Sequence, residues 1–193
     1  MAQPRSTPAA LLIVAAFSRH DDALAWARRK LEEAHGPIAL SSPAYAFDMT
    51  RYYEPAMGAG LRKVLWAFAR RIDPARLADV KLASNALEDE LAAGGLYPEA
   101  RPLNLDPGYL VLGKFVLATT KDQAHRLYLR DGIFAEVTLH YQDGAFRAWP
   151  WTYADYRLDE VLAFLGTARE YYKNPSPQPS PRSGEGEQER GVR

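Results

Sequence analysis

Residues 125–149, HRLYLRDGIFAEVTLHYQDGAFRAW, contain two Asp-Gly pairs, and each pair lies between segments in which apolar residues alternate with other residues. Asp-Gly in this setting is the strongest short-range signal for a two-residue β-hairpin turn. The pattern therefore predicts three antiparallel strands, joined by turns at residues 131–132 and 143–144. A further apolar run over residues 114–119 adds a fourth strand to this meander.

Two-residue turns determine which residues face each other across neighbouring strands. Counting outward from the two turns, the expected pairs are Arg130–Ile133, Leu127–Glu136, His125–Thr138, Gln142–Ala145, His140–Arg147 and Thr138–Trp149. Because side chains alternate between the two faces of a strand, one face should be polar and aromatic. It carries His125, Glu136, Thr138, His140, Arg147 and Trp149, whereas the other face carries Ile133, Ala135, Val137, Leu139 and Tyr141 and is typical of a core.

The polar face has two interpretations. An antiparallel sheet often exposes one face to water, which would account for polar residues without any function. Such faces usually carry Lys, Glu and Thr, whereas this one carries two histidines and a tryptophan. That composition favours a ligand-binding surface.

The segments before and after the meander alternate between strand and helix patterns. Apolar runs near residues 9–17, 37–47 and 61–69 predict strands, although the last of these is also compatible with a helix by composition. Helical spacing and end signals predict helices between about Ser18 and Gly36, over residues 74–93 and over residues 155–172. The expected fold class is α+β, with a ferredoxin-like βαββαβ N-terminal part that continues into the antiparallel β-meander and a C-terminal helix.

The C-terminal end differs from the rest of the chain. Residues 1–173 have the composition of a single α+β domain, whereas residues 174–193 contain four alternating prolines and almost no large apolar residues. A segment of this kind does not bury enough surface to offset its ordering entropy. The sequence therefore predicts a disordered tail over residues 174–193.

Composition narrows the classes of function and partner. The chain has 24 basic and 24 acidic residues, so it lacks the overall positive charge that drives sequence-independent nucleic-acid binding. It has no cysteine, which excludes disulfides, thiolate metal sites and a cysteine nucleophile. No stretch is long and apolar enough to span a bilayer. Residues 9–17 are also compatible with a short signal peptide, but a buried strand is favoured, which predicts a cytoplasmic protein without a membrane partner.

Candidate site residues gather at one end of the predicted meander, because the loop at residues 120–124 and the turn at residue 143 lie at the same end. Lys, Arg and His donors there suit a phosphate or carboxylate. The candidate ligand-binding residues are Tyr52, Asn104, Tyr109, Lys121, Arg126, His140 and Arg147, and the candidate acid–base residues are Asp122, His125 and Glu136. Of these, Arg126 points away from the polar face unless its strand begins later than residue 125.

Two other sequence features bear on the site. Asp106-Pro107-Gly108 has the chemistry of a turn, which accounts for these three residues but not for the neighbouring Asn104 and Tyr109. Glu136 and His140 lie four residues apart on a strand, about 13 Å, which is too far to bind one ion together. We therefore predict no metal site, and the sequence identifies no cofactor.

Several motifs together resemble a bacterial protein family of unknown function, number 4416. They are FDMTRYYEPAMG (47–58), KLASNALE (81–88), NLDPGYL (104–110), VLATTKDQAHRLYL (116–129), GIFAEVTL (132–139) and WTYADYR (151–157). The resemblance covers most of residues 9–173 and implies a small bacterial protein, but it implies no reaction.

The leading functional hypothesis is binding of a small anionic ligand, a phosphate ester or a nucleotide, at the polar rim of the sheet. Whether a reaction follows is left open. The alternative is a non-catalytic protein–protein interaction module, for which the eleven tyrosines and four tryptophans are suited. RNA binding is third, since the neutral charge makes nucleic acid an unfavoured partner. Homo-oligomerisation also remains open.

Overall fold

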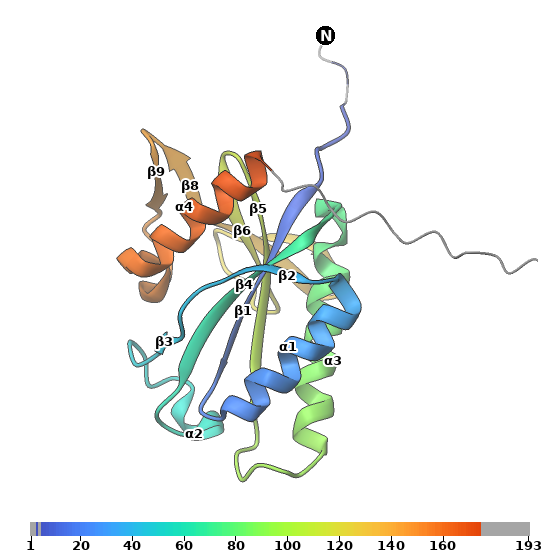
Figure 1. Ribbon diagram of the computed structural model, residues 1–193, viewed down its shortest axis with the longest axis vertical. Coiled ribbons are helices and arrows are strands. Elements are labelled where there is room, and N and C mark those ends of the chain that lie inside the picture. Colours follow the sequence, from blue (N-terminus) through green and yellow to red (C-terminus); the bar gives the residue numbers. More distant parts are fainter. Residues whose placement is uncertain (1–2, 4, 175–193) are drawn as a thin grey trace, which may run out of the picture.

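A computed structural model describes residues 3 and 5–174 of the chain (Figure 1). The strands are β1 (Ala10–Ser18), β2 (Ile38–Ser41), β3 (Tyr45–Ala46), β4 (Arg62–Ile72), β5 (Asn104–Val111), β6 (Lys114–Thr119), β7 (Leu127–Arg130), β8 (Ile133–Gln142) and β9 (Ala145–Ala148). The helices are α1 (Asp21–His35), α2 (Glu54–Met57), α3 (Leu77–Ala93) and α4 (Asp159–Lys173). Short 3₁₀ turns at Pro74–Arg76 and Ala154–Arg157 precede α3 and α4. The expected disordered tail lies, apart from Asn174, outside the described residues.

The strands form one antiparallel sheet in the order β2-β4-β1-β5-β6-β8-β7, with β3 also paired to β4 and β9 to β8. The four strands β2, β4, β1 and β5, in this sheet order, have the ferredoxin-like connectivity. In that connectivity β1 and β4 lie adjacent in the middle, although α1 and β2 lie between them in the chain. The α+β class is confirmed, with the antiparallel strands and the C-terminal helix as expected. The strands after β5 do not form a regular meander, however, because β6 pairs with β8 and β7 does not lie between them.

Both faces of the central strands are covered. Leu12, Val14 and Ala16 of β1 pack with apolar residues of α1 and α3, whereas Leu11 and Ile13 pack with α4 on the opposite face. The same holds for β4, so residues 64–69 form a continuous apolar run. Such a run has no clear period, which explains why the sequence left the choice between strand and helix open.

The turn predicted at Asp106-Pro107-Gly108 is wrong, because these residues lie within β5 and pair with β1. The pairing with β6 begins only at Gly108, one residue after the proline. The missing N–H of Pro107 therefore interrupts no hydrogen bond between β5 and β6. A Cβ on Gly108 would lie 2.4 Å from the carbonyl oxygen of Val116. The glycine therefore permits a close approach of two backbones rather than a turn.

Gly108→Ala is expected to destabilise the protein by about 1–3 kcal/mol, because the added methyl group must displace the backbone of β6. The matched control is Gly113→Ala, where a Cβ has no atom within 4 Å, and that change should alter stability by less than about 0.5 kcal/mol. Urea unfolding of both variants compares them. Equal stability of the two variants would contradict this account of Gly108.

The two hairpin turns form where expected. Asp131, Gly132, Asp143 and Gly144 all have positive φ, as a type I′ turn requires. Around the second turn, His140 pairs with Arg147 and Gln142 with Ala145, which confirms that register. The predicted pair of Thr138 and Trp149 does not form, because the pairing ends one residue earlier, at Leu139 and Ala148.

The predicted register around the first turn is wrong beyond its first pair. Arg130 pairs with Ile133, but an irregularity between Tyr128 and Arg130 places Leu127 opposite Ala135 instead of Glu136. His125 precedes β7 and has no partner in the ladder. A bulge shifts the register by one residue on one strand, and the turn sequence does not encode it.

A second irregularity divides β8. Leu139 pairs with Phe115 and Val137 with Val116, so Thr138 is left without an opposite residue on β6. Ile133, Ala135 and Val137 therefore pack with α3 residues, whereas Leu139 packs with the α4 layer. The expectation that one continuous face of β8 forms the core is wrong for this reason. The polar residues of β8 are likewise divided by the irregularity at Thr138.

Candidate functional site

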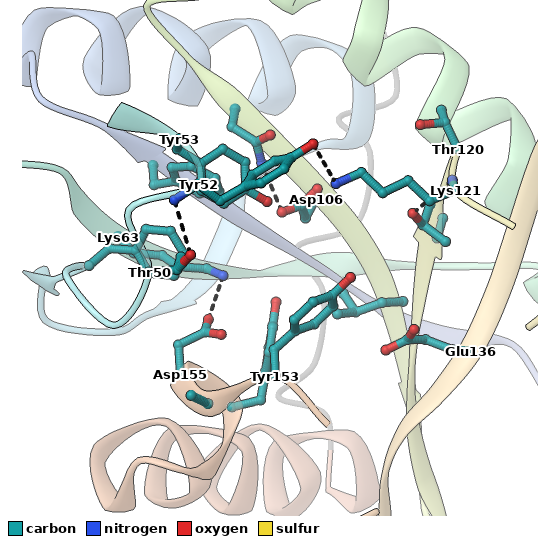
Figure 2. A pocket seen from close by; sticks show the side chains of 18 of the residues that line it. Thr50, Tyr52, Tyr53, Lys63, Asp106, Thr120, Lys121, Glu136, Tyr153 and Asp155 are labelled. Carbon is teal, nitrogen blue, oxygen red and sulfur yellow. Dashed lines mark hydrogen bonds and ion pairs between the residues drawn. The ribbon is translucent and has the colours of Figure 1, made fainter. Parts of the chain in front are cut away.

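A cavity of about 420 Å³ lies on the α4 face of the sheet (Figure 2). Its volume is in the range of small-molecule sites. Its floor consists of residues from β1, β4, β5, β6 and β8, and its walls come from segments 47–53, 119–126 and 153–156. Three buried or partly buried groups of charged residues surround it.

The first group joins β4 to the turn before α4. Lys63 Nζ lies 2.6 Å from Asp155 Oδ2, and both side chains are at most 5% exposed. The rings of Phe17, Phe47 and Tyr156 surround the same ammonium, with centroids 4.6 to 5.4 Å away. The direct contacts of this ammonium are thus one carboxylate and three rings, which makes that carboxylate essential to its burial.

The second group joins α3 to β5. Lys81 Nζ donates to the carbonyl oxygen of Leu105 (2.7 Å) and lies 3.4 Å from Asp106 Oδ1. Asn104 Nδ2 donates to Asp106 Oδ2 at 2.8 Å, and Arg101 bonds both Asn104 and Glu88. Desolvation by burial raises the pKa of Glu88 above its usual value, although Lys81 and Arg101 oppose this.

The third group contains three predicted site residues. Glu136 Oε2 accepts from Arg126 Nε (2.8 Å) and lies 3.1 Å from His125 Nε2, while its Oε1 accepts from Thr138 Oγ1 (3.3 Å). The side chains of Arg126 and Glu136 are each 1% exposed. Arg126 also donates to the carbonyl oxygen of Lys121 and to the Tyr153 hydroxyl, so it connects two walls of the cavity.

A stack of four rings continues from this group along the outer edge of β8. In order, the rings are those of His125, Trp151, Trp149 and His140, with neighbouring centroids 4.2 to 5.3 Å apart. This edge pairs with β7 at one end of β8 and with β9 at the other. Between them, Trp151 Nε1 donates to the Val137 carbonyl and Thr152 Oγ1 to the Thr138 carbonyl. These two side chains therefore supply hydrogen bonds to backbone carbonyls in the part of β8 that lies between its pairings with β7 and β9.

Lys121 and Tyr52 meet at the mouth of the cavity. Lys121 Nζ lies 3.2 Å from the Tyr52 hydroxyl and 4.3 Å from the centroid of its ring. Figure 2 shows this contact, with Thr120 beside Lys121 and with Tyr153 on the opposite side of the cavity from Tyr52. Within the described part of the chain, the Lys121 ammonium has no carboxylate partner.

The structure brings some of the candidate residues together and separates others. The cavity is lined by five candidates: Tyr52, Asn104, Lys121, Arg126 and Glu136. His125 is not part of the lining but contacts Glu136. Arg126 reaches this face because β7 begins at residue 127, after it.

Five candidates lie outside the cavity lining: His125, Asp122, Tyr109, His140 and Arg147. Asp122 is exposed, and Tyr109 packs with the α3 layer. His140 stacks on Trp149, and Arg147 lines a shallower depression between β9 and α4. The irregularity at Thr138 separates these last two from Glu136, which corrects the expectation that all three share one face of the sheet.

Sequence reasoning missed Lys63, Asp106, Tyr153 and Asp155 as parts of the site. Lys63 was detectable as a lone lysine at the start of a buried apolar strand, a position where a charge needs a partner. The other three lie in segments whose sequence was explained by turn or helix-start chemistry.

The described residues contain no group of three or more His, Asp and Glu side chains placed to hold a metal ion. No helix of residues 3 and 5–174 is long and apolar enough to cross a membrane.

The comparisons with known proteins identify a family. Neither the curated proteins nor the solved structures contain a significant match to this chain. A family model does match, over residues 7–172, a range that includes every segment around the cavity. The chain therefore belongs to the family described as Domain of unknown function (DUF4416).

Proposed function

We propose that the cavity binds a small anionic molecule, with its anionic group at Lys121. The main support for this proposal is that the Lys121 ammonium lies at the mouth of the cavity without a carboxylate partner among the described residues. Its backbone is held on both sides, because the Lys121 carbonyl accepts from Arg126 Nη1 (2.8 Å) and its N–H donates to Thr119 Oγ1 (3.2 Å). A cation held in position in this way is suited to a phosphate or carboxylate.

The other basic residues of the lining support this placement, because each is already paired. Lys63 is paired with Asp155, Arg126 with Glu136, Arg101 with Glu88, and Lys81 lies 3.4 Å from Asp106. An anion that approached any of them would compete with a nearby carboxylate. The uncompensated positive charge is therefore at the mouth and not on the floor.

The acid–base role that the sequence suggests for Asp122, His125 and Glu136 remains a prediction. Both oxygens of Glu136 already accept hydrogen bonds or lie within hydrogen-bonding distance of a partner, and its side chain is almost completely buried. These contacts support a positioning role for Glu136, which orients Arg126 and through it the two walls. We also retain bacterial origin and a cytoplasmic location as predictions from the sequence.

Lys121→Met is expected to weaken binding of phosphate esters by about tenfold or more, because a hydrogen bond to a charged group contributes about 1.5–3 kcal/mol. A thermal-shift screen of inorganic phosphate, sugar phosphates and nucleotides identifies a ligand, and calorimetry compares the variants. Lys114→Met, an exposed lysine of β6 outside the cavity, is the matched control. A flat screen with folded protein, or an equal loss in both variants, would refute the proposal.

An interaction module remains the second candidate because of one observation on β7. Its side chains Leu127, Tyr128 and Leu129 are 75%, 61% and 40% exposed, on a strand at the end of the sheet. Exposed apolar edge strands are sites of pairing with other chains. Sedimentation analysis of the native chain and of Leu127→Lys tests this candidate, which requires an assembly in the native chain that the substitution disrupts.

A further inference from the structure

Hydrogen-bonding capacity on the cavity floor is concentrated at Asp106. Its side chain is 28% exposed, whereas those of Asp155 and Glu136 are 5% and 1% exposed. Oδ2 accepts from Asn104, but Oδ1 has only the 3.4 Å contact with Lys81, whose ammonium already lies 2.7 Å from the Leu105 carbonyl. Asp106 therefore keeps an accessible oxygen on the side of the cavity.

The charge state of this carboxyl decides what it can bind. Burial alone raises the pKa of Asp106, but Lys81, Lys63 and the hydrogen bond from Asn104 outweigh burial and lower the pKa below its usual value. Asp106 is therefore ionised at neutral pH, and an ionised carboxylate only accepts hydrogen bonds. A ligand group that reaches it must be a donor, such as a hydroxyl.

The walls of the cavity offer aromatic surface. Tyr52 and Tyr153 are 67% and 45% exposed, and Figure 2 shows them on opposite sides of the cavity. Exposed tyrosine rings beside a cation are suited to stacking of a nucleobase, whose phosphate then lies near the cation.

The inference that follows rests on the proposed function and extends it. We infer that the ligand is a ribonucleoside monophosphate, whose phosphate binds Lys121, whose base stacks on Tyr52 or Tyr153, and whose sugar hydroxyls donate to Asp106. A monophosphate fits because Lys121 is the one basic residue of the described lining that has no carboxylate nearby. The sugar hydroxyls are the donors that the ionised floor requires.

The test is calorimetry of the full chain with the four ribonucleoside 5′-monophosphates and with their 2′,3′-dideoxy analogues. At least one ribonucleotide should bind, and its dideoxy analogue should bind at least about tenfold more weakly, because the analogue offers no sugar hydroxyl to Asp106. This comparison uses the native protein, so it does not depend on whether any variant folds.

A substitution of Asp106 tests whether this residue binds the sugar hydroxyls. Asp106→Asn should weaken ribonucleotide binding by about tenfold and leave binding of the dideoxy analogue unchanged, whereas the exposed Asp89→Asn on α3 should change neither. Equal affinities of the ribo and dideoxy forms would overturn the inference while the proposed function stands. Binding of other phosphate esters without any nucleotide would do the same. If no anionic molecule of either panel binds, both proposals fail.

Discussion

Asp155→Asn is expected to lower the free energy of unfolding by about 3–5 kcal/mol, because it leaves the Lys63 ammonium buried without its counter-charge. The Lys63 side chain is 3% exposed, and its direct contacts besides Asp155 are with aromatic rings. Cation–π contacts offset only part of the loss. Urea unfolding at neutral pH, followed by tryptophan fluorescence, measures the change.

Two comparisons make this result specific. Asp89→Asn removes an exposed carboxylate of α3 and should change stability by less than about 0.5 kcal/mol. Lys63→Met combined with Asp155→Leu removes both charges, and the double variant should be more stable than Asp155→Asn, since apolar residues of similar size often replace a buried pair without loss. A single variant as stable as the control would contradict the role assigned to this pair.

Glu136→Gln is expected to cost about as much, roughly 3–5 kcal/mol, because it leaves the buried guanidinium of Arg126 without a carboxylate. The substitution should also weaken binding at the mouth of the cavity. Arg126 bonds the Lys121 carbonyl and the Tyr153 hydroxyl, so loss of its anchor loosens both walls. Unfolding and binding are measured on the same protein preparation.

The control for Glu136→Gln is Glu90→Gln, which breaks the exposed pair of Glu90 with Lys30, at a Nζ–Oε1 distance of 2.8 Å. Exposed ion pairs contribute about 0–1 kcal/mol, so the control should remain close to the native protein. Equal losses in the two variants would show that burial does not distinguish these pairs. A full loss of stability with unchanged ligand affinity would show that Arg126 does not position the walls.

The buried ion pairs explain why this cavity is suited to binding although most of its charges are unavailable. Each pair connects two separate elements: β4 to the turn before α4, α3 to the segment before β5, and the segment before β7 to β8. The pairs hold the walls in place before a ligand arrives, which lowers the ordering cost of binding. The groups left free, Lys121 at the mouth and Asp106 on the floor, then determine what binds.

The candidate site was partly predictable. Lys121, Arg126 and Glu136 were selected from turn positions and strand alternation, and they do meet, but not through the register that was expected. Glu136 and Arg126 meet because Arg126 precedes β7. His140 and Arg147 were selected by the same rule and lie elsewhere, because the rule assumes a regular strand and β8 is irregular at Thr138.

The sequence by itself determined the α+β class, the approximate positions of the three long helices and both Asp-Gly turns, because these depend on local preferences and on the period of apolar residues. Tertiary structure alone decided that Pro107 and Gly108 lie in a strand, that β7 and β8 are irregular, and that Lys63 meets Asp155 across 92 positions. Such features depend on how backbones and charges from distant segments fit together, and no local pattern records that fit.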